Sequence, residues 1–273
     1  MGADELVDES YGEAPGRGRL AGRRILVVGG GQADHGLEDP PIGNGRAMSI
    51  LFAREGAAVA VADIDAASAE ATAQRVRAEG AEAAVVVADA GDEQAVEEMF
   101  AAARDALGAL DGLALNVGIG AGLGLRGTTA EDWDRVMAVN LRSQFLGCKH
   151  ALGAMEDGGA IVLMGSVAAR EVMPLPAYSA SKAALEALCR HAAVEAAPRL
   201  RVNLLHPGLI DTSLGRMASR VNPAREQVKI LAGRQGTGWE VAYAALYLLC
   251  GESAYVTGQT LIVDGGLTVA PRA

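Results

Sequence analysis

The sequence predicts a single α/β domain built on a doubly wound parallel sheet, with a layer of helices on each face. Short apolar runs alternate with Ala- and Glu-rich segments of helical periodicity from residue 24 almost to the end of the chain. Apolar runs that are continuous rather than alternating are typical of strands buried on both faces, as in a parallel sheet. The chain has 273 residues, which is within the size range of one such domain.

The expected strands and helices follow one another in alternation. Apolar runs predict strands at residues 24–28, 58–62, 84–88, 113–115, 160–164, 202–205 and 260–263. Helical periodicity predicts helices at residues 46–55, 66–79, 92–107, 130–155, 177–197 and 239–249. Asp65 can cap the second helix and Gly80 can end it. Thr128 or Thr129 can open the fourth helix, and Pro198 can stop the fifth.

Two segments fall outside this pattern. Residues 1–20 are acidic and contain no apolar core of a secretory signal, so we expect a flexible tail there, followed by one domain over residues 21–273. Residues 213–236 contain no convincing strand, and we expect them to form a substrate loop after the sixth strand.

The composition limits the functional class. The net charge of −10 disfavours binding to nucleic-acid phosphates. No apolar run approaches the roughly 20 residues that span a bilayer, so no membrane segment is expected. The cysteines, Cys148, Cys189 and Cys250, are odd in number and form no Cys-x-x-Cys pair. We therefore expect neither a disulfide framework nor a zinc site, and a reducing cytoplasm is the expected location.

A glycine-rich turn follows the first expected strand. Glycines at a strand-to-helix turn let a pyrophosphate approach the backbone and lie at the helix N-terminus. Twelve residues separate Gly30 from Gly43, whereas such turns normally allow about three. We interpret the stretch from Gln32 to Ile42 as an inserted excursion before the Gly43-Asn44-Gly45 turn. Its polar side chains could hold a metal, but a solvated loop is favoured, so no metal site is predicted. The stretch could instead fold over the phosphate or ribose region of a bound cofactor.

Acidic residues end the second and third expected strands. Asp63 stands where a carboxylate can bind both ribose hydroxyls of an adenosine. It would repel a 2′-phosphate, and no Arg or Lys follows within the next several residues, so NAD is favoured over NADP. At the end of the third strand, the side chain of Asp89 or the backbone of Ala90 could meet the adenine ring.

A tyrosine and a lysine carry the predicted chemistry. Tyr178 and Lys182, in the sequence YSASK, are four residues apart in a helix-forming segment and therefore share one helix face. A nearby ammonium stabilises a phenolate, so Lys182 is expected to lower the pKa of Tyr178. Tyr178 can then exchange a proton with a substrate oxygen while a hydride moves to or from carbon. Ser166, at the end of the fifth strand, could hold the same oxygen. Alone, Tyr-x-x-x-Lys is common by chance and more often a surface pair.

With these residues assembled, the chain resembles the classical short-chain dehydrogenase/reductase family, from about Leu20 to Leu267. The matches occur in order: the glycine turn, Asp63, Asp89, LNVGI at 115–119, VNL around Asn140, Ser166, YSASK, HPGLIDT at 206–212 and YVTGQTLIVDGG at 255–266. The resemblance implies a Rossmann-like, three-layer α/β/α fold. It also implies an NAD(H)-dependent oxidoreductase that acts on a secondary alcohol or ketone.

The resemblance implies a role for each matching residue. Asn140 would hold a water in a proton relay through Lys182, Ser166 would orient the carbonyl, and Tyr178 would be the general acid/base. Lys182 would also bind the nicotinamide ribose. The residues expected to bind the cofactor are Gly30, Gly43, Asn44, Gly45, Asp63, Ile64, Asp89, Ala90, Asn116, Gly118, Tyr178, Lys182, Pro207, Gly208, Ile210 and Thr212. Asn116 and Asn140 could instead act mainly by satisfying backbone groups.

The sequence departs from the family pattern near the cofactor. Gly29 stands where the family usually has Thr, and Val117 replaces the second asparagine of Asn-Asn-Ala-Gly. The excursion puts the geometry of the pyrophosphate site in question. Ser166 and Tyr178 are twelve residues apart, at the short end of the family's spacing. None of these departures removes a catalytic residue.

The substrate and the oligomeric state are less closely defined. The expected pocket wall is apolar, which favours a hydrophobic or cyclic ketone or alcohol. Its members are Met173, Pro174, Leu175, Leu209, Leu214 and Met217. Arg170, Glu171, Arg216 and Arg220 are near in sequence and could be surface charges. The resemblance implies a homotetramer in which helices at about 92–107 and 130–152 pair between subunits.

Two other functions on the same fold stay open. A dehalogenase-like lyase or an epimerase would be favoured by loss of the glycine turn or by Arg in place of Lys182, and neither is seen. A non-catalytic NAD-sensing or scaffold protein predicts a broken catalytic set, whereas all four members are present.

Overall fold

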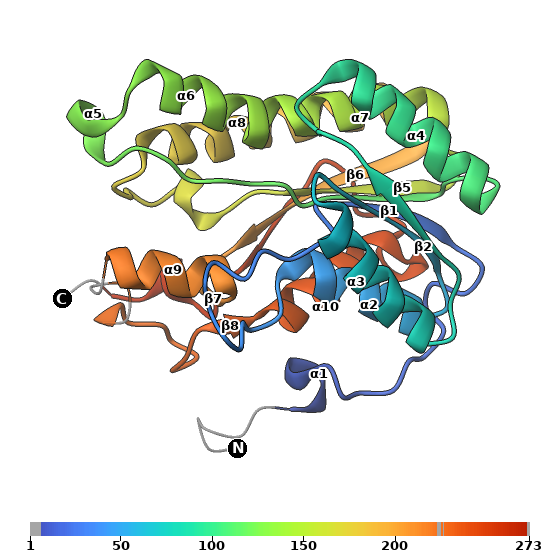
Figure 1. The fold of residues 1–273 in the computed structure, drawn as a ribbon, viewed down its shortest axis with the longest axis horizontal. Helices are drawn as coiled ribbons and strands as arrows, with labels where there is room; N and C mark the ends of the chain where they lie inside the picture. Colours follow the sequence, from blue (N-terminus) through green and yellow to red (C-terminus); the bar gives the residue numbers. More distant parts are fainter. Residues whose placement is uncertain (1–6, 223–224, 226, 272–273) are drawn as a thin grey trace.

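The computed structural model describes residues 7–222, 225 and 227–271. Its centre is a parallel sheet, as the sequence predicted (Figure 1). The sheet has seven strands in the order β3-β2-β1-β4-β5-β6-β9. The strands are β1 (Arg24–Val28), β2 (Ala58–Asp63), β3 (Ala83–Val87), β4 (Gly112–Leu115), β5 (Gly159–Met164), β6 (Leu200–Pro207) and β9 (Thr260–Val263). The chain builds outward from β1 to β3 and then returns to the centre at β4. The carboxyl ends of β1 and β4 therefore mark the switch point, where such sheets bind ligands.

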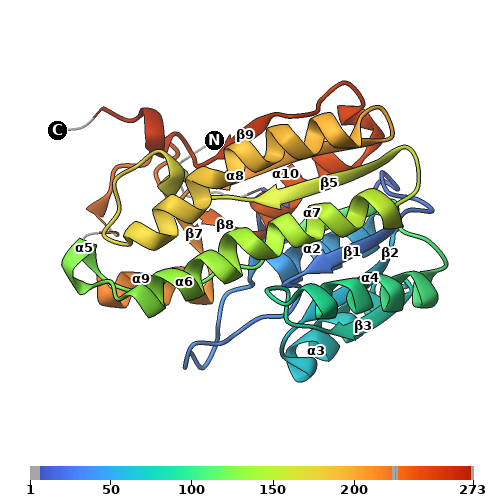
Figure 2. The same ribbon diagram turned by 90° about the horizontal axis from the view of Figure 1, so that it is seen from above.

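Helices cover both faces of the sheet (Figures 1 and 2). One face carries α4 (Glu93–Leu107), α7 (Ser143–Ala154) and α8 (Pro176–Ala196), and the other carries α2 (Asn44–Arg54), α3 (Ala66–Ala78) and α10 (Gly238–Leu249). In β1, Leu26 and Val28 point into the first layer, whereas Ile25 and Val27 point into the second. This burial on both sides explains the continuous apolar run.

The helix limits follow from the caps that the sequence suggested. Asp65 accepts hydrogen bonds from the backbone N–H groups of Ala67 and Ser68 at the start of α3. Thr129 and Asp132 form a reciprocal capping box at the start of α6 (Ala130–Met137). The helix expected over residues 130–155 is interrupted, because a π-helical segment, η1 (Ala138–Arg142), separates α6 from α7. The 3.6-residue period cannot reveal a single π turn.

Short elements complete the chain. They are α1 (Asp8–Tyr11), α5 (Gly124–Gly127), η2 (Val167–Ala169), β7 (Ile210–Asp211), α9 (Ser213–Val221), β8 (Gly236–Thr237), η4 (Gly251–Ser253) and η5 (Leu267–Val269). The segment expected to be a loop at 213–236 therefore begins with a helix, and β8 at its end pairs with β7. Within the described residues, no helix is both long enough and apolar enough to cross a bilayer.

The amino-terminal segment differs from the flexible tail that we expected over residues 1–20. The Ser10 hydroxyl donates a hydrogen bond to Glu240 at 2.9 Å, and the Thr237 hydroxyl donates to the Ser10 carbonyl at 2.9 Å. Leu20 is fully buried, and Arg19 pairs with the buried Glu55 at 2.6 Å. These contacts hold residues 7–20 against α2 and α10, while residues 1–6 lie outside the described part of the chain.

Candidate active site

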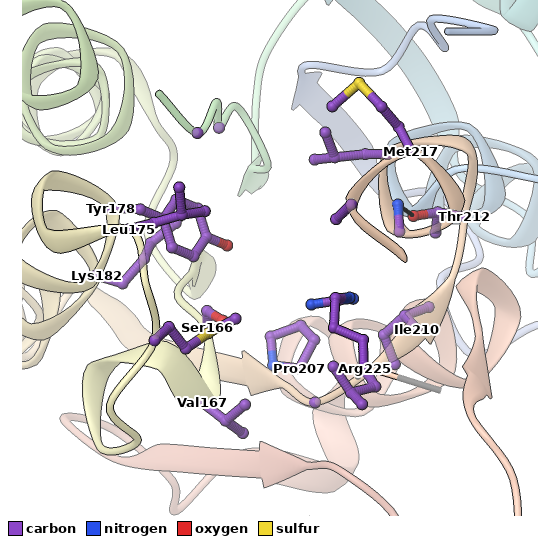
Figure 3. Close-up of a pocket in the computed structure, with 18 of the residues that line it drawn as sticks. Ser166, Val167, Leu175, Tyr178, Lys182, Pro207, Ile210, Thr212, Met217 and Arg225 are labelled. Atoms are coloured by element: carbon purple, nitrogen blue, oxygen red, sulfur yellow. Dashed lines mark hydrogen bonds between the residues drawn. The ribbon is translucent and has the colours of Figure 1, made fainter. Parts of the chain in front are cut away.

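A cavity of about 420 Å³ opens at the switch point, beyond the carboxyl ends of β4, β5 and β6. Figure 3 shows side chains converging on it from several elements. The predicted site residues that line it are Asn44, Asn116, Gly118, Ser166, Tyr178, Lys182, Pro207, Gly208, Ile210 and Thr212. The predicted residues outside its lining are Gly30, Gly43, Gly45, Asp63, Ile64, Asp89, Ala90 and Asn140.

The glycine turn between β1 and α2 is closely packed. Gly29 has a φ of 77°, a left-handed conformation that favours glycine. A Cβ atom at Gly45 would lie 1.9 Å from the Gly29 carbonyl oxygen, so only glycine lets α2 start this near β1. The Asn116 side-chain amide donates a hydrogen bond to the same oxygen at 2.9 Å. Asn116 thus ties the turn to the end of β4.

The excursion, residues 32–42, is closed at its base by Gln32. The Gln32 side-chain oxygen accepts a hydrogen bond from the Gly43 N–H at 2.7 Å, and the Gln32 N–H donates to the Ser68 hydroxyl at 2.5 Å. The Ser213 hydroxyl donates to the Ala33 carbonyl at 2.6 Å, which links the excursion to the start of α9. These hydrogen bonds therefore hold the two ends of residues 32–42 close together.

The N-terminus of α2 faces the cavity through Asn44, the first residue of this eleven-residue helix. The Asn44 Oδ1 atom is buried and has no hydrogen-bond partner among the described residues. Gly43, in the cap position, provides no side-chain cap for the first helical N–H groups. Because helix N-termini attract anions, the first backbone N–H groups of α2, which have no side-chain cap, fit the pyrophosphate of a dinucleotide.

Asp63 braces the glycine turn and faces a cation that sequence reasoning missed. Its carboxylate accepts a hydrogen bond from the Gly31 N–H at 2.9 Å. Arg46 in α2 donates to the Thr72 hydroxyl at 2.9 Å. Burial lowers the pKa of Arg46, Arg75 adds to that effect, and the Asp63 charge opposes it. Arg46 precedes Asp63 in the sequence and lies on another element, so the residues that follow Asp63 do not reveal it.

The outer edge of the cofactor region lies at the ends of β2 and β3. Ile64 is 69% exposed, and the Asp89 side chain is exposed and accepts a hydrogen bond from the Gly91 N–H at 2.8 Å. Ala90 is buried. These residues lie on the same sheet edge as Asp63, so a ligand that extends from the cavity along the sheet edge would reach them.

Asn140 lies in the π-helical segment and is fully buried. Its side-chain oxygen accepts from the Ile119 N–H at 2.8 Å, and its amide donates to the Ile119 carbonyl at 2.9 Å and to the Ser181 hydroxyl at 3.1 Å. The side chain thus clamps the loop after β4 against α8. π turns of this kind often mark functional sites.

Ser166 follows β5 and faces the cavity. Its hydroxyl accepts a hydrogen bond from the Ala168 N–H at 3.2 Å, which caps η2. Its backbone N–H donates to Nδ1 of the buried His206 at 3.0 Å. Sequence reasoning did not single out His206, because a histidine in a strand carries no visible partner in the sequence.

Tyr178 and Lys182 share one face of α8, as predicted, and the Lys182 Nζ atom lies 5.7 Å from the centre of the Tyr178 ring. The expected direction of the Tyr178 pKa is wrong. Burial raises it above the usual value, while Ser166 and Arg225 act in the opposite direction. Burial also lowers the pKa of Lys182 to about 7. Because a lysine with this pKa is partly neutral at neutral pH, it stabilises the phenolate less than a full ammonium would.

The opposite wall of the cavity comes from the chain after β6. Pro207 ends β6, and β7 places Ile210 against the cavity. The Thr212 hydroxyl accepts a hydrogen bond from the Gly215 N–H at 3.1 Å and caps α9. The six apolar wall residues predicted from the sequence all line the cavity.

One charged wall residue was not predicted. Arg170 pairs with Glu186 and Arg216 pairs with Asp211, and neither arginine lines the cavity. Arg225 does line it. Residues 222–235 have no periodicity that would have identified this side chain.

Comparison with known proteins agrees with this geometry. A family model described as enoyl-(acyl carrier protein) reductase matches residues 42–268. A short-chain dehydrogenase/reductase from Serratia marcescens has a TM-score of 0.83 and 33% sequence identity, and the match covers 92% of this chain and 99% of that chain. This chain belongs to the short-chain dehydrogenase/reductase family.

Relatives of this short-chain dehydrogenase/reductase include two proteins of Xanthobacter autotrophicus. A 2-(S)-hydroxypropyl-CoM dehydrogenase 3 is 37% identical over 92% of this chain and 98% of its own length. A protein named inactive 2-(S)-hydroxypropyl-CoM dehydrogenase 2 is 42% identical over 81% of this chain and 99% of its own length. The family membership makes the protein an oxidoreductase that acts on CH–OH groups. Since one relative is named inactive, the reaction must be argued from the residues of this site.

Proposed function

We propose that this short-chain dehydrogenase/reductase transfers a hydride between NAD(H) and a secondary alcohol or ketone, with Tyr178 as the general acid/base. The observation that supports this most directly is the convergence of Tyr178, Ser166 and Lys182 on one wall of the cavity (Figure 3). The N-terminus of α2 and the carboxylate of Asp63 lie on the cofactor side. One cavity can therefore receive both a nicotinamide and a carbonyl group.

Bound NAD would accept or supply the hydride. The N-terminus of α2, with Asn44 and Gly45, would hold its pyrophosphate, and Asp63 would bind the adenosine ribose hydroxyls. Lys182 would bind the nicotinamide ribose, and Ile210 and Thr212 would lie along the nicotinamide. The choice of NAD over NADP rests on the repulsion between the Asp63 carboxylate and a 2′-phosphate.

Tyr178 would move the proton of the reaction. Because burial raises its pKa, the phenol keeps its proton at neutral pH, which is the form that protonates a ketone oxygen during reduction. The Ser166 hydroxyl would hold the same oxygen. For alcohol oxidation the phenolate must form, and a protonated Lys182 beside the ring would favour it. Asn140 would hold the loop after β4 in the position that a proton relay through Lys182 requires.

Further proposals concern the surroundings of the site. The apolar wall supports a hydrophobic or cyclic substrate skeleton, and residues 213–236 would form the substrate loop of a single domain over residues 21–273. The excursion would shield the bound cofactor, and its deletion without any change in NADH affinity or release would contradict that role. Assembly as a homotetramer and a cytoplasmic location are proposed from the family resemblance and the composition.

The proposal is tested first by binding and then by turnover. NADH and NADPH are titrated separately, with nicotinamide fluorescence and thermal shift as readouts, and tighter binding of NADH is expected. NADH-dependent reduction of cyclic and linear ketones is then compared for the wild type, Tyr178→Phe and the control Tyr255→Phe, whose side chain is fully exposed. Tyr178→Phe is expected to lose about 100-fold or more in turnover while it still binds NADH.

Each result decides one part of the proposal. A preference for NADPH would overturn the role given to Asp63. Near-wild-type turnover in Tyr178→Phe would overturn proton transfer by Tyr178. Failure to bind either nucleotide would favour a lyase or a scaffold on the same fold.

A further inference from the structure

Arg225 points into the cavity from the wall opposite Tyr178. Figure 3 shows its guanidinium group and the Tyr178 hydroxyl directed toward the same space. Both side chains line the cavity, and each contributes electrostatically to the pKa of the other. Burial lowers the pKa of Arg225 from its usual value, so the cation has lost part of its hydration.

In the part of the chain that the structure describes, the guanidinium has no polar partner. Among the described residues, Arg225 forms no side-chain hydrogen bond and no ion pair, and its buried Nε atom is unsatisfied. Arg170 and Arg216, which are near the cavity in the sequence, differ because each pairs with a carboxylate. A partly desolvated cation without a partner is unfavourable, which suggests that its partner is a ligand.

The side chains around the cavity indicate the sign of the charge on that ligand. The described lining residues include two basic side chains, Lys182 and Arg225, and no Asp or Glu. The whole chain, in contrast, carries a net charge of −10. The cavity is therefore a local positive region in an acidic protein, a field that attracts anions.

We infer that the substrate is an organic acid, in which a secondary alcohol or ketone and a carboxylate or sulfonate are joined by a short apolar skeleton, and that Arg225 binds the oxyanion. This inference rests on the proposed function and specifies its substrate. The planar guanidinium can donate two parallel hydrogen bonds to such a group. Apolar neighbours such as Leu175 and Met217 would pack on the skeleton between the two polar ends.

The cofactor is a less suitable partner for Arg225. The features that fit its phosphates and adenosine ribose are the N-terminus of α2 and Asp63, on the side of β1 and β2. Arg225 instead faces the hydroxyl of Tyr178, where the substrate oxygen must lie if Tyr178 transfers the proton. The oxyanion would therefore sit beyond the reacting carbon.

The test compares acids with neutral molecules of the same shape. The probes are 3-oxobutanoate, 4-oxopentanoate and 5-oxohexanoate. Each is paired with the neutral diketone in which a methyl group replaces one of the two carboxylate oxygens. A further probe, 3-oxobutane-1-sulfonate, tests a second kind of oxyanion. Reduction by NADH and thermal stabilisation in the presence of NADH are both measured. The proteins are the wild type, Arg225→Met, Arg225→Lys and the control Arg220→Met, which removes an exposed arginine of α9 outside the cavity lining.

We expect the wild type to prefer at least one acid over its neutral partner by about 10- to 100-fold in kcat/KM, and Arg225→Met to remove that preference. Arg225→Lys should retain part of it, and Arg220→Met all of it. NADH affinity should stay unchanged in every variant. Equal use of acids and neutral ketones by the wild type, or loss of NADH affinity in Arg225→Met, would overturn the inference while leaving the proposed reaction intact. Stabilisation by acids that depends on Arg225, without any turnover, would support the inference and contradict the reaction.

Discussion

The Nδ1 atom of His206 accepts a hydrogen bond from the backbone N–H of Ser166 at 3.0 Å. Since this nitrogen accepts, the ring proton lies on Nε2, which is 3.2 Å from Glu186 and donates to it. Burial lowers the pKa of His206, while Glu186 opposes that effect, and the ring therefore stays neutral. Gly165 makes the contact possible, because a Cβ atom there would lie 2.1 Å from Nδ1. A neutral imidazole thus fixes the peptide that presents the Ser166 hydroxyl.

We predict that His206 is a positioning residue for Ser166. His206→Leu should lower kcat by roughly 10-fold or more, because the freed peptide can shift the hydroxyl. His206→Asn can place an oxygen near the position of Nδ1 and should recover part of the loss. The Kd for NADH should change little. The control is His191→Leu, on the exposed side of α8. Equal losses in the Leu and Asn variants would indicate a packing role only.

A second prediction concerns the buried Lys182. Its folded pKa of about 7 lies below the value of about 10.5 in the unfolded chain, so the unfolded state binds more protons between these two values. The free energy of unfolding should therefore rise with pH across this window. The destabilisation caused by burying the charged Lys182 should be fully present below pH 7. Lys182→Met removes the penalty and should stabilise the protein by roughly 1–3 kcal/mol more at pH 6.5 than at pH 9.5.

Urea unfolding of the wild type and Lys182→Met at the two pH values measures this difference. The Met164 carbonyl, which accepts from Lys182 at 2.9 Å, also accepts from Gln144 at 2.9 Å and so keeps a partner in the variant. Lys149→Met, at an exposed lysine of α7, is the control and should show no such pH dependence. A gain that does not depend on pH would show that the ammonium is not desolvated.

The strands and most helices could be predicted because their signals are local. Ile25 and Val27 face one helical layer and Leu26 and Val28 the other, so the run in β1 is apolar at every position and reads directly as a buried strand. The Asp65 cap likewise needs only the two residues that follow it. The shared position of Tyr178 and Lys182 on one face of α8 follows from their spacing of four residues.

The features that were not predicted depend on contacts between distant parts of the chain. Arg46 and Asp63 interact electrostatically from two different elements, and Arg225 reaches the cavity from a segment without periodicity. The direction of the Tyr178 pKa depends on how much solvent the cavity walls exclude, which spacing cannot report. The amino-terminal segment looked like a tail because its anchor, Glu55, lies in another part of the sequence.

A third prediction tests whether Asp63, rather than a neighbouring acidic residue, sets the preference for NADH over NADPH. Asp63→Ser should weaken NADH binding by about 10-fold and improve NADPH binding, because the repulsion is gone and Arg46 can meet a 2′-phosphate. The double variant Asp63→Ser with Arg46→Met should lose that gain. Asp65→Ser removes one nearby charge but can still cap α3, so it should leave the preference unchanged. Titration with NADH and NADPH gives the ratio of the two affinities. If this ratio shifts as much in Asp65→Ser as in Asp63→Ser, net charge alone decides the cofactor preference.

The last prediction concerns the ion pair that anchors the amino-terminal segment. The Glu55 side chain is 1% exposed and accepts hydrogen bonds from the Arg19 guanidinium at 2.6 Å and from the backbone N–H groups of Arg19 and Arg17 at 2.9 and 3.0 Å. Burial alone would raise the pKa of Glu55, but these donors outweigh it and lower the pKa below the usual value. The stabilisation is therefore present above the unfolded pKa and is lost as pH falls through the folded pKa.

Glu55→Gln should accordingly lower the free energy of unfolding by roughly 1–3 kcal/mol at pH 7, and the difference from the wild type should shrink below pH 4. Glu70→Gln breaks an ion pair with Arg77 whose side chains are 44% and 45% exposed, and it should change stability by less than about 1 kcal/mol. Urea unfolding gives both values. Because cleavage requires a released backbone, limited proteolysis should also cut the segment before α2 faster in Glu55→Gln than in Glu70→Gln. Equal stability and equal cleavage in the two variants would mean that burial of Leu20, rather than the ion pair, holds the segment in place.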